Sequence, residues 1–316
     1  PVGAQRHEIA ARIAGRRRRP LDVADLAHRI RRDRHRDVGE AQALPALAAE
    51  HDARRLIDGC EATVLLVEAG PSGIGVPEID DPTRWVPLGR SRYDWGYDYA
   101  PSPHVNGRTI GIPRGRVLGG SSATNAMMWY RGAAADYEAW GEGWSFAEVL
   151  PYFRRAEDWA GGASVWRGAG GPLRIAPSPE LHPIAAALIE AAVERGVPRI
   201  DDPNGASNEG AAPSNFNIVD GKRWSAAEGY LRPVLGAANL DVLTGSLAVE
   251  LIIENGRCVG VRHRVEGALQ ETRAEVGVVL ALGAIDTPRL LTLSGIGDPE
   301  DLKRLGIPTK VAAPGV

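Results

Sequence analysis

The alternation of apolar and polar residues predicts several short strands in the C-terminal part of the chain. Leu240–Leu243 and residues 248–253 are apolar runs of strand length, and the turn sequence Glu254-Asn255-Gly256-Arg257 follows the second run. Because Asn-Gly favours the left-handed backbone of a tight turn, this stretch predicts a β-hairpin. Residues 63–70 and 276–282 are apolar almost throughout, which is typical of strands buried in a parallel sheet.

Apolar residues at helical spacing predict two further elements. Residues 136–160 alternate charged and apolar positions, and Pro183–Glu194 forms a second amphipathic pattern that a proline opens and Gly196 closes. Weaker helical patterning covers residues 21–30 and 41–57. The apolar positions of the first pattern, which we expect to lie in the core rather than in a site, are Trp140, Trp144, Val149, Leu150 and Phe153.

The N-terminal segment differs in composition from the rest of the chain. Residues 1–58 contain thirteen arginines, no lysine, no aromatic residue and only three of the 38 glycines. Such a segment could be a basic arm for nucleic acid or an unpaired, solvated stretch. We favour the second interpretation, because no aromatic residue is interleaved with the charge to stack on bases.

Composition bounds the remaining possibilities. A chain of 316 residues with 44% hydrophobic content makes one large or two medium domains. The net charge of −3 argues against nucleic acid as the main partner. Cys60 and Cys258 are too few for a disulfide framework and lack metal-ligand spacing, so we expect a cytoplasmic protein without a metal site. No apolar run is long enough for a membrane span.

Two glycine-rich stretches carry the chemistry. The first reads Gly-Arg-Val-Leu-Gly-Gly-Ser-Ser-Ala-Thr-Asn-Ala-Met-Met-Trp-Tyr-Arg-Gly from Gly115 to Gly132. Adjacent glycines and serines allow a backbone to come close to a phosphate or a flavin ring and to present N–H and hydroxyl donors. The second stretch runs from Gly283 to Gly297, directly after the apolar run 276–282.

Together the two stretches resemble the signature regions of the glucose-methanol-choline (GMC) family of FAD-dependent alcohol oxidoreductases. The resemblance implies that FAD binds against both stretches and against an acidic residue that ends the second strand of a Rossmann-like unit. It also implies which residues contact FAD through their side chains or backbone groups. These are Glu68, Trp95, Val117, Gly119, Gly120, Ser121, Asn125, Met127, Ala248, Gly283 and Ala284. For Trp95, a buried core position is an equally good alternative.

The resemblance is incomplete at both ends. A GxGxxG turn should precede Glu68 by about 20 residues, but residues 40–50 contain no glycine and place Pro45 where a helix should begin. We therefore hypothesise that residues before about 53 are translated out of frame. The chain also begins with Pro1 and stops in a loop-like sequence, which suggests a fragment of a longer protein.

The family's catalytic groups are only partly matched. Members that tether FAD covalently use a His just before the flavin-facing Asn, and here Thr124 takes that position, so the resemblance implies non-covalent FAD. The family's proton-abstracting His follows the second signature. The seven histidines of this chain all precede it, and none is assigned as a catalytic base. We expect each to have a surface or core role.

The predicted architecture is α/β, with a Rossmann-like FAD-binding domain of the GMC type built from discontinuous segments. Residues 54–150 and 236–316 form this domain, residues 151–235 form a partial α+β substrate domain, and residues 1–53 form the atypical Arg-rich segment. The resemblance implies hydride transfer from a small-molecule alcohol to FAD, in the manner of choline dehydrogenase, with an unidentified electron acceptor. The alternatives are a catalytically inactive fragment of such an enzyme and a GMC-fold lyase.

Overall fold

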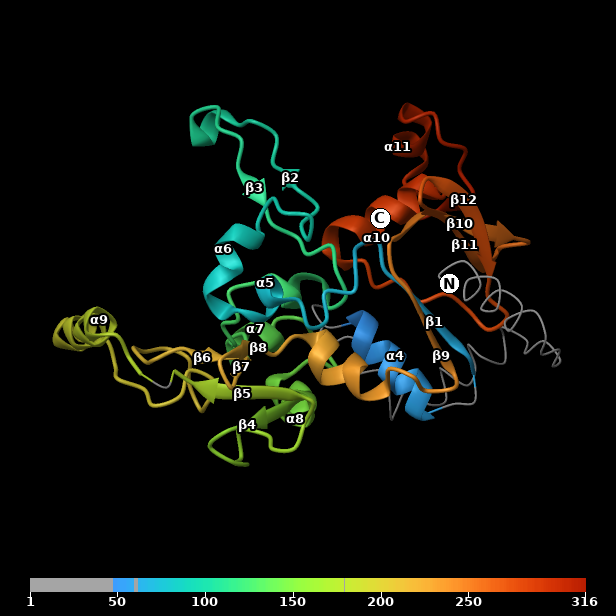
Figure 1. Ribbon diagram of the computed structural model, residues 1–316. Helices are drawn as coiled ribbons and strands as arrows, with labels where there is room; N and C mark the ends of the chain where they lie inside the picture. Colours follow the sequence, from blue (N-terminus) through green and yellow to red (C-terminus); the bar gives the residue numbers. More distant parts are fainter. Residues whose placement is uncertain (1–47, 60–61, 179) are drawn as a thin grey trace. The chain divides into compact units, whose positions relative to one another are not determined.

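The computed structural model describes residues 48–59, 62–178 and 180–316 (Figure 1). Most of the Arg-rich segment, the helix predicted at 21–30 and the position expected for a GxGxxG turn lie outside these residues. Of the helical pattern at 41–57, the described part forms helix α4, Ala48–Gly59. This helix begins before residue 53, where the sequence suggested that the atypical segment ends.

The described chain divides into two compact units. The first unit contains residues 51–72 and 234–316, and the second contains residues 48–50 and 73–233. Residues 73–150, which the sequence analysis assigned to the FAD-binding domain, therefore cluster with the segment that it assigned to the substrate domain. The discontinuous domain boundaries remain a prediction, and each unit is described by itself.

In the first unit, two predicted strands form a parallel pair. Strand β1, Val64–Val67, pairs with β9, Leu240–Leu243, so that Val64 lies opposite Leu240. The pairing continues past β1, because Glu68 N donates to Leu243 O at 2.9 Å. A parallel pair combined with helices fits the α/β class expected from the sequence.

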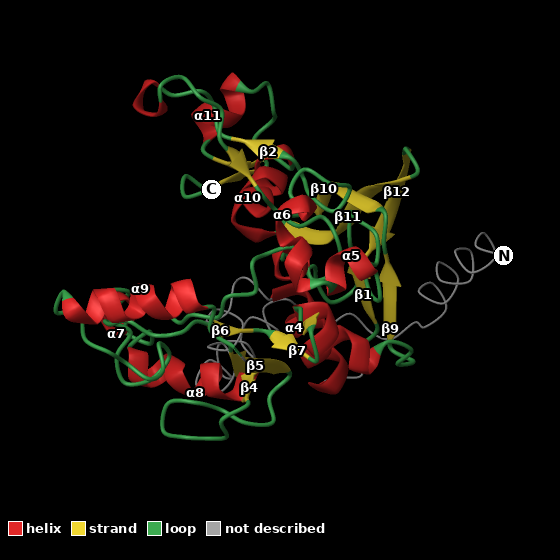
Figure 2. Ribbon diagram, turned by 60° about the vertical axis from the view of Figure 1, so that its left-hand side comes forward, coloured by secondary structure: helices red, strands yellow, loops and turns green. Residues whose placement is uncertain are grey.

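The predicted hairpin is also present in the first unit. Strands β10, Ser246–Glu254, and β11, Arg257–Val265, are antiparallel, and β12, Ala268–Arg273, adds a third strand (Figure 2). Asn255 and Gly256 form the tight turn with φ values of 51° and 76°. This left-handed backbone is the reason for the Asn-Gly sequence.

The strand predicted at 276–282 does not form. These residues are irregular, and Val279 is 62% exposed. An apolar run becomes a strand only when neighbouring strands pair with its backbone, and no described strand pairs with this one. The chain continues into helix α10, Gly283–Leu293, which Ser294 caps, since its N–H donates to Leu290 O at 3.0 Å.

The first unit ends in short elements. Strands β13, Ile296–Gly297, and β14, Val311–Ala312, form a parallel pair, and helix α11, Pro299–Arg304, lies between them in the sequence. The Asp298 carboxylate caps α11 by accepting from Glu300 N at 2.8 Å.

The second unit is built from short helices and strands joined by loops, as the Gly- and Pro-rich sequence predicts. Its helices are α5, Pro77–Asp80; α6, Trp85–Leu88; α7, Ala134–Glu138; α8, Phe146–Ala156; and α9, Pro183–Glu194. Its single helical turns are η3, Pro82–Arg84; η4, Pro103–Val105; η5, Gly120–Ala123; and η6, Ala227–Leu231; the turn η7, Arg232–Val234, follows at the boundary of the units. Its strands are β2, Tyr97–Asp98; β3, Gly111–Ile112; β4, Glu157–Trp159; β5, Leu173–Pro177; β6, Asn215–Phe216; β7, Ile218–Val219; and β8, Lys222–Arg223.

The helical pattern at 136–160 forms two helices rather than one. Gly141 and Gly143 adopt φ values of 99° and 85° between α7 and α8, a backbone that a continuous helix does not permit. Val149 and Phe153 of α8 are buried as expected, whereas Trp140 is 59% exposed, which corrects its core assignment. Trp140 instead lies at the edge of the cluster around Val149 and Phe153, with its ring 5.2 Å from that of Tyr137 and 5.4 Å from that of Trp144.

Helix α9 has the predicted boundaries but buries none of its residues. Ile184 and Leu188 are 66% and 67% exposed, although their spacing is that of a packed helix face. Among the described residues, no helix is both long and apolar enough to cross a membrane.

Candidate functional site

The first signature stretch forms a tight loop around the turn η5. Gly119 and Gly120 have φ values of 90° and 51°, and a Cβ atom on Gly115 would lie 2.1 Å from Gly120 O. Glycine is therefore required at residue 115 by close backbone approach. A Cβ atom on Gly120 would have no atom within 4 Å, so the chain leaves open space at this residue.

Two of the predicted ligand-binding groups already have partners within the second unit. The N–H of Gly119 donates to Glu50 Oε1 at 2.6 Å, and the Ser121 hydroxyl oxygen accepts from Gly115 N at 3.1 Å. These bonds hold the loop in shape. A ligand would meet what remains exposed, the backbone at Gly120 and the half-buried Ser121 hydroxyl.

The side chains of Val117 and Met127 do not face solvent. Both are buried, and Val117 belongs to a core cluster with Ile79, Leu88 and Tyr93. Val117 is 0% and Met127 3% exposed, backbone included, so neither residue is open to a ligand in this conformation. The sequence could not distinguish this from side-chain contact, because an apolar residue in a Gly-rich loop serves either purpose.

Asn125 is the predicted residue whose side chain is placed to meet a ligand. It is exposed, and its Oδ1 accepts from Met127 N and from Arg223 Nη1, both at 2.9 Å. Because both donors bind the oxygen, the NH₂ group is the end of the amide that remains for a ligand.

Trp95 lies in the loop before the first signature and is half-buried. The guanidinium of Arg116 lies over its ring at 5.2 Å, and the Tyr97 ring stacks on it at 5.8 Å with an interplanar angle of 8°. The ring therefore packs against neighbours on two sides, but it is half-buried rather than in the buried core position that was the alternative to a flavin contact, and its role remains a prediction.

Arg223, on β8, lies behind the signature loop. Its Nε donates to Ile79 O at 3.0 Å, and its Nη1 donates to Asn125 O at 2.7 Å. Burial lowers the pKa of Arg223 to about 10, against the opposing effect of Asp80. Arg223 is not among the residues that the sequence predicted for the site.

A small cavity adjoins the Arg223 guanidinium. Its volume of about 10 Å³ is close to the minimum that a single water molecule needs. Asp80, Ser225 and Glu228 contribute polar groups to its wall. Burial, and then the charge of Glu228, raise the pKa of Asp80 above its ordinary value.

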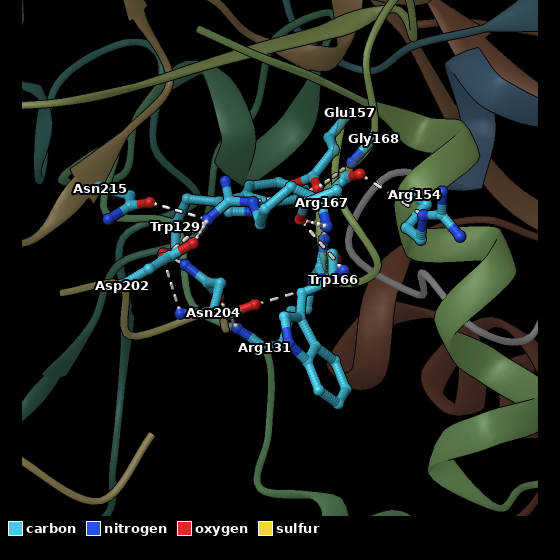
Figure 3. Close-up of polar contacts among 11 residues, drawn as sticks. Trp129, Arg131, Arg154, Glu157, Trp166, Arg167, Gly168, Asp202, Asn204 and Asn215 are labelled. Carbon is cyan, nitrogen blue, oxygen red and sulfur yellow. Dashed lines mark hydrogen bonds and ion pairs between the residues drawn. The ribbon is translucent and has the colours of Figure 1, made fainter. Parts of the chain in front are cut away.

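A buried charged cluster anchors the C-terminal end of the first signature stretch (Figure 3). Arg131, the penultimate residue of the stretch, donates to Glu157 Oε1, and Arg167 Nε donates to the same oxygen at 3.1 Å. Arg167 Nη1 also reaches Asp202 Oδ1 at 2.9 Å. Asn204 Oδ1 accepts from Arg131 N at 2.7 Å, so both the backbone and the side chain of Arg131 are held.

The remaining predicted residues lie in the first unit. Glu68 follows β1, and its Oε1 accepts from Gly70 N at 2.7 Å. Ala248 is half-buried within β10, and Gly283 and Ala284 are exposed at the beginning of α10. The predicted binding residues are therefore divided between the two units.

Two residues that hold the site were not predicted from the sequence. Glu50 lies in an Ala-rich stretch that the sequence analysis assigned to the atypical segment, so nothing nearby indicated its contact with Gly119. Arg223 lies about 100 residues from the loop that it contacts, so local sequence could not indicate the contact.

Comparison with known proteins decides the family. The family model described as GMC oxidoreductase matches residues 47–311. The chain belongs to the GMC oxidoreductase family. The resemblance inferred from the two signature stretches is thus confirmed, and the match begins next to the first residue of α4.

Curated relatives agree with this assignment. An oxygen-dependent choline dehydrogenase of Sinorhizobium fredii is 40% identical over 284 residues, which cover 88% of this chain and 50% of the relative. The protein of the same name from Brucella anthropi has the same identity and coverage. The chain spans about half the length of the curated relatives that it matches.

Solved structures show the same fold. A pyridoxine 4-oxidase from Mesorbium loti is 34% identical with a TM-score of 0.78, over 87% of this chain and 54% of that chain. An FAD-dependent oxidoreductase from Chaetomium thermophilum is 30% identical with a TM-score of 0.77, over 88% of this chain and 50% of that chain. The α/β FAD-binding fold class of the GMC type expected from the sequence is confirmed.

Proposed function

We propose that this chain supplies FAD-binding elements of an enzyme that oxidises an alcohol to an aldehyde or ketone. The observation that carries the proposal is the conformation of the first signature loop. Its two left-handed glycines leave open space at Gly120, and Asn125 presents a side-chain NH₂ group to solvent. The names of the relatives, choline dehydrogenase and FAD-dependent oxidoreductase, support the same function.

The residues present fit FAD. The open backbone at Gly120 admits a group that any larger residue would obstruct, and Asn125 offers hydrogen-bond donors to carbonyl or ring nitrogen acceptors. In the first unit, Glu68 ends a parallel strand, where a carboxylate can accept hydrogen bonds from ribose hydroxyls. We assign Ala248, Gly283 and Ala284 to the same cofactor.

When bound, FAD would supply the hydride acceptor for the reaction. The residues of this chain would bind and orient it, with Gly119 and Ser121 keeping the loop in shape and Asn125 donating a hydrogen bond. Thr124 has no nucleophilic ring nitrogen with which to tether a flavin, so we propose that FAD dissociates reversibly. We place the enzyme in the cytoplasm, because its two cysteines indicate no disulfide framework.

The substrate class that we propose is a small alcohol of the choline kind. It rests on the 40% identity to oxygen-dependent choline dehydrogenases. The pyridoxine 4-oxidase relative makes an aromatic alcohol the second choice. We leave the electron acceptor open, since no described residue discriminates oxygen from another oxidant.

The test is a titration of the purified chain with FAD, followed by visible absorption and flavin fluorescence. Binding should perturb the visible bands of the flavin, and dialysis should remove it. Asn125→Ala should weaken binding about tenfold, because it removes one hydrogen bond to the ligand. The exposed Asn208→Ala in the same unit is the matched control and should bind FAD as the unmodified chain does.

A second candidate, an inactive fragment, is favoured by the absence of a GxGxxG sequence in the 20 residues before Glu68. A chain that leaves the visible bands and the fluorescence of added FAD unchanged would support this candidate. If FAD binds but no alcohol in a panel bleaches it under anaerobic conditions, the lyase alternative gains support instead.

A further inference from the structure

The segment from Arg223 to Ala227 packs directly against the back of the first signature loop. Ala226 N donates to the Ser122 hydroxyl oxygen at 2.9 Å, and that hydroxyl donates to Gly119 O at 2.6 Å. A Cβ atom on Gly119 would lie 3.3 Å from Ala227 Cβ. The segment therefore supports the loop on the side away from the open space at Gly120.

Arg223 makes the most extensive contact in this segment. Its Nη1 donates to both Asn125 O and Asn125 Oδ1, at 2.7 and 2.9 Å, while Nε donates to Ile79 O at 3.0 Å. The guanidinium thus binds the backbone and the side chain of Asn125 together. The planar guanidinium reaches Asn125 and Ile79 O from two fixed nitrogens, which the single ammonium nitrogen of lysine cannot do.

The charge of Arg223 is buried without an ion pair. The residue is 2% exposed, and the carboxylate of Asp80 acts on it only through its charge, without an ion pair among the described residues. Its Nη2 has no hydrogen-bond partner in the described part of the chain. A buried, unpaired charge is costly, so a neutral residue would serve better if the position required only packing.

The bond to Asn125 has a consequence at Met127. Met127 has a φ of 59°, a left-handed backbone that costs an L-residue roughly 1–2 kcal/mol. Its N–H donates to Asn125 Oδ1 at 2.9 Å, the same oxygen that Arg223 holds. The guanidinium therefore fixes the acceptor that keeps Met127 in this conformation.

We propose that Arg223 is a positioning residue that sets the orientation of the Asn125 amide and the left-handed turn at Met127. By binding Oδ1, it directs the NH₂ group of Asn125 toward the ligand side. The purpose of this orientation, which we take to be the binding of FAD, rests on the proposed function. The positioning itself is a property of the chain without a ligand and can be tested without one.

The test is amide hydrogen exchange of the ligand-free chain. Arg223→Met should raise the exchange rate of the Met127 amide on the order of tenfold, because its acceptor is no longer held. Arg223→Lys should raise it by less, since an ammonium keeps one bond but not the fork. Unchanged exchange at Met127 in Arg223→Lys would overturn the proposal, and this variant carries the test if Arg223→Met does not fold.

Two controls separate positioning from general destabilisation. Lys222→Gln changes the exposed neighbour on β8 and should leave exchange at Met127 unchanged. Arg167→Met removes a buried arginine of the same unit and should raise exchange around Glu157 and Asp202 instead. An equal rise at Met127 in Arg167→Met and Arg223→Met would show that Arg223 has no specific role.

The FAD titration then links the two proposals without confusing them. If the unmodified chain binds FAD, Arg223→Lys should weaken binding about as much as Asn125→Ala. A second possible result is that Arg223→Lys exchanges faster at Met127 and still binds FAD with the affinity of the unmodified chain. That result would show that the positioning does not serve the cofactor. If the unmodified chain binds no FAD, the proposed function fails, and hydrogen exchange still decides the positioning.

Discussion

At the scale of single residues, the glycines of the signature loop have distinct physical reasons. Gly119 and Gly120 adopt left-handed φ values, whereas Gly115 is required by close approach, because its missing side chain lets Gly120 O come near. The sequence predicted that this stretch brings backbone close to a ligand. It did not show that one glycine serves contact within the loop itself.

Replacement of Gly115 tests this assignment. A Cβ atom there would meet Gly120 O at 2.1 Å and Ser121 N at 2.8 Å, both backbone atoms that cannot move independently. Gly115→Ala should lower the free energy of unfolding by about 1–3 kcal/mol, the usual cost of overpacking. The measurement is the midpoint of urea unfolding.

Gly277→Ala is the control for Gly115→Ala. Its added Cβ would have no atom within 4 Å, and its φ is not left-handed. Stability should change little or rise slightly, through a less flexible unfolded chain. Equal losses in the two variants would show that the close approach at Gly115 is not the cause.

At the scale of elements, hydrogen bonds between polar side chains cross the three-stranded sheet β10–β11–β12. The buried His263 has its Nδ1 2.7 Å from the Ser246 hydroxyl and its Nε2 2.9 Å from the Thr272 hydroxyl. Burial lowers the pKa of His263 below its ordinary value of 6.5. The structure thus gives this histidine the core role that the sequence analysis allowed.

The lowered pKa predicts how stability depends on pH. The unfolded chain binds a proton at His263 near pH 6.5, and the folded chain does so only at lower pH. Stability is therefore highest above pH 6.5 and falls as the pH drops below it, until the folded histidine also titrates. Because His263 is a single titrating group, it can change the free energy of unfolding by at most about 1.4 kcal/mol per pH unit.

Urea unfolding at several pH values between 5 and 8 measures this dependence. The free energy of unfolding of the unmodified chain should fall below pH 6.5 more steeply than that of His263→Gln, which has no titrating group at this position. Parallel curves for the two proteins would mean that His263 does not carry the effect.

Other elements show where local sequence was sufficient. The Asn255-Gly256 turn requires φ values that these two residues adopt readily, so the hairpin follows from local chemistry. Residues 276–282 are as apolar as a buried strand, yet they remain irregular, because strand formation depends on a hydrogen-bonded neighbour that their own sequence does not supply.

At the scale of the whole molecule, segments far apart in the sequence are joined by the cluster around Glu157. Glu157 is completely buried and accepts hydrogen bonds from Arg131, Arg167 and the backbone of Gly168. Asp202 adds the second negative charge. Because the two arginines share the Glu157 carboxylate, its removal leaves two buried positive charges for which Asp202, paired with Arg167, is the one acidic partner left among the described residues.

Glu157→Leu should therefore destabilise the second unit by about 3–5 kcal/mol, the usual cost of breaking a buried ion pair. Hydrogen exchange should accelerate in β4, β5 and the loop at Asp202, while the β10–β11 hairpin of the first unit keeps its protection. The neighbouring Asp158→Asn changes an exposed ion pair of 4.0 Å and should cost less than about 1 kcal/mol. Similar losses in both variants would contradict a buried network.

The sequence by itself determined the family, the two glycine-rich stretches, the strand character of β1 and β9, and the boundaries of α9. These depend on local periodicity, turn chemistry and residue type. Only the tertiary structure decided that Val117 and Met127 turn inward, that Asn125 presents its NH₂ group, and that Glu50 and Arg223 hold the loop. Such outcomes depend on contacts between residues far apart in the chain, and neither spacing nor composition encodes which donor meets which acceptor.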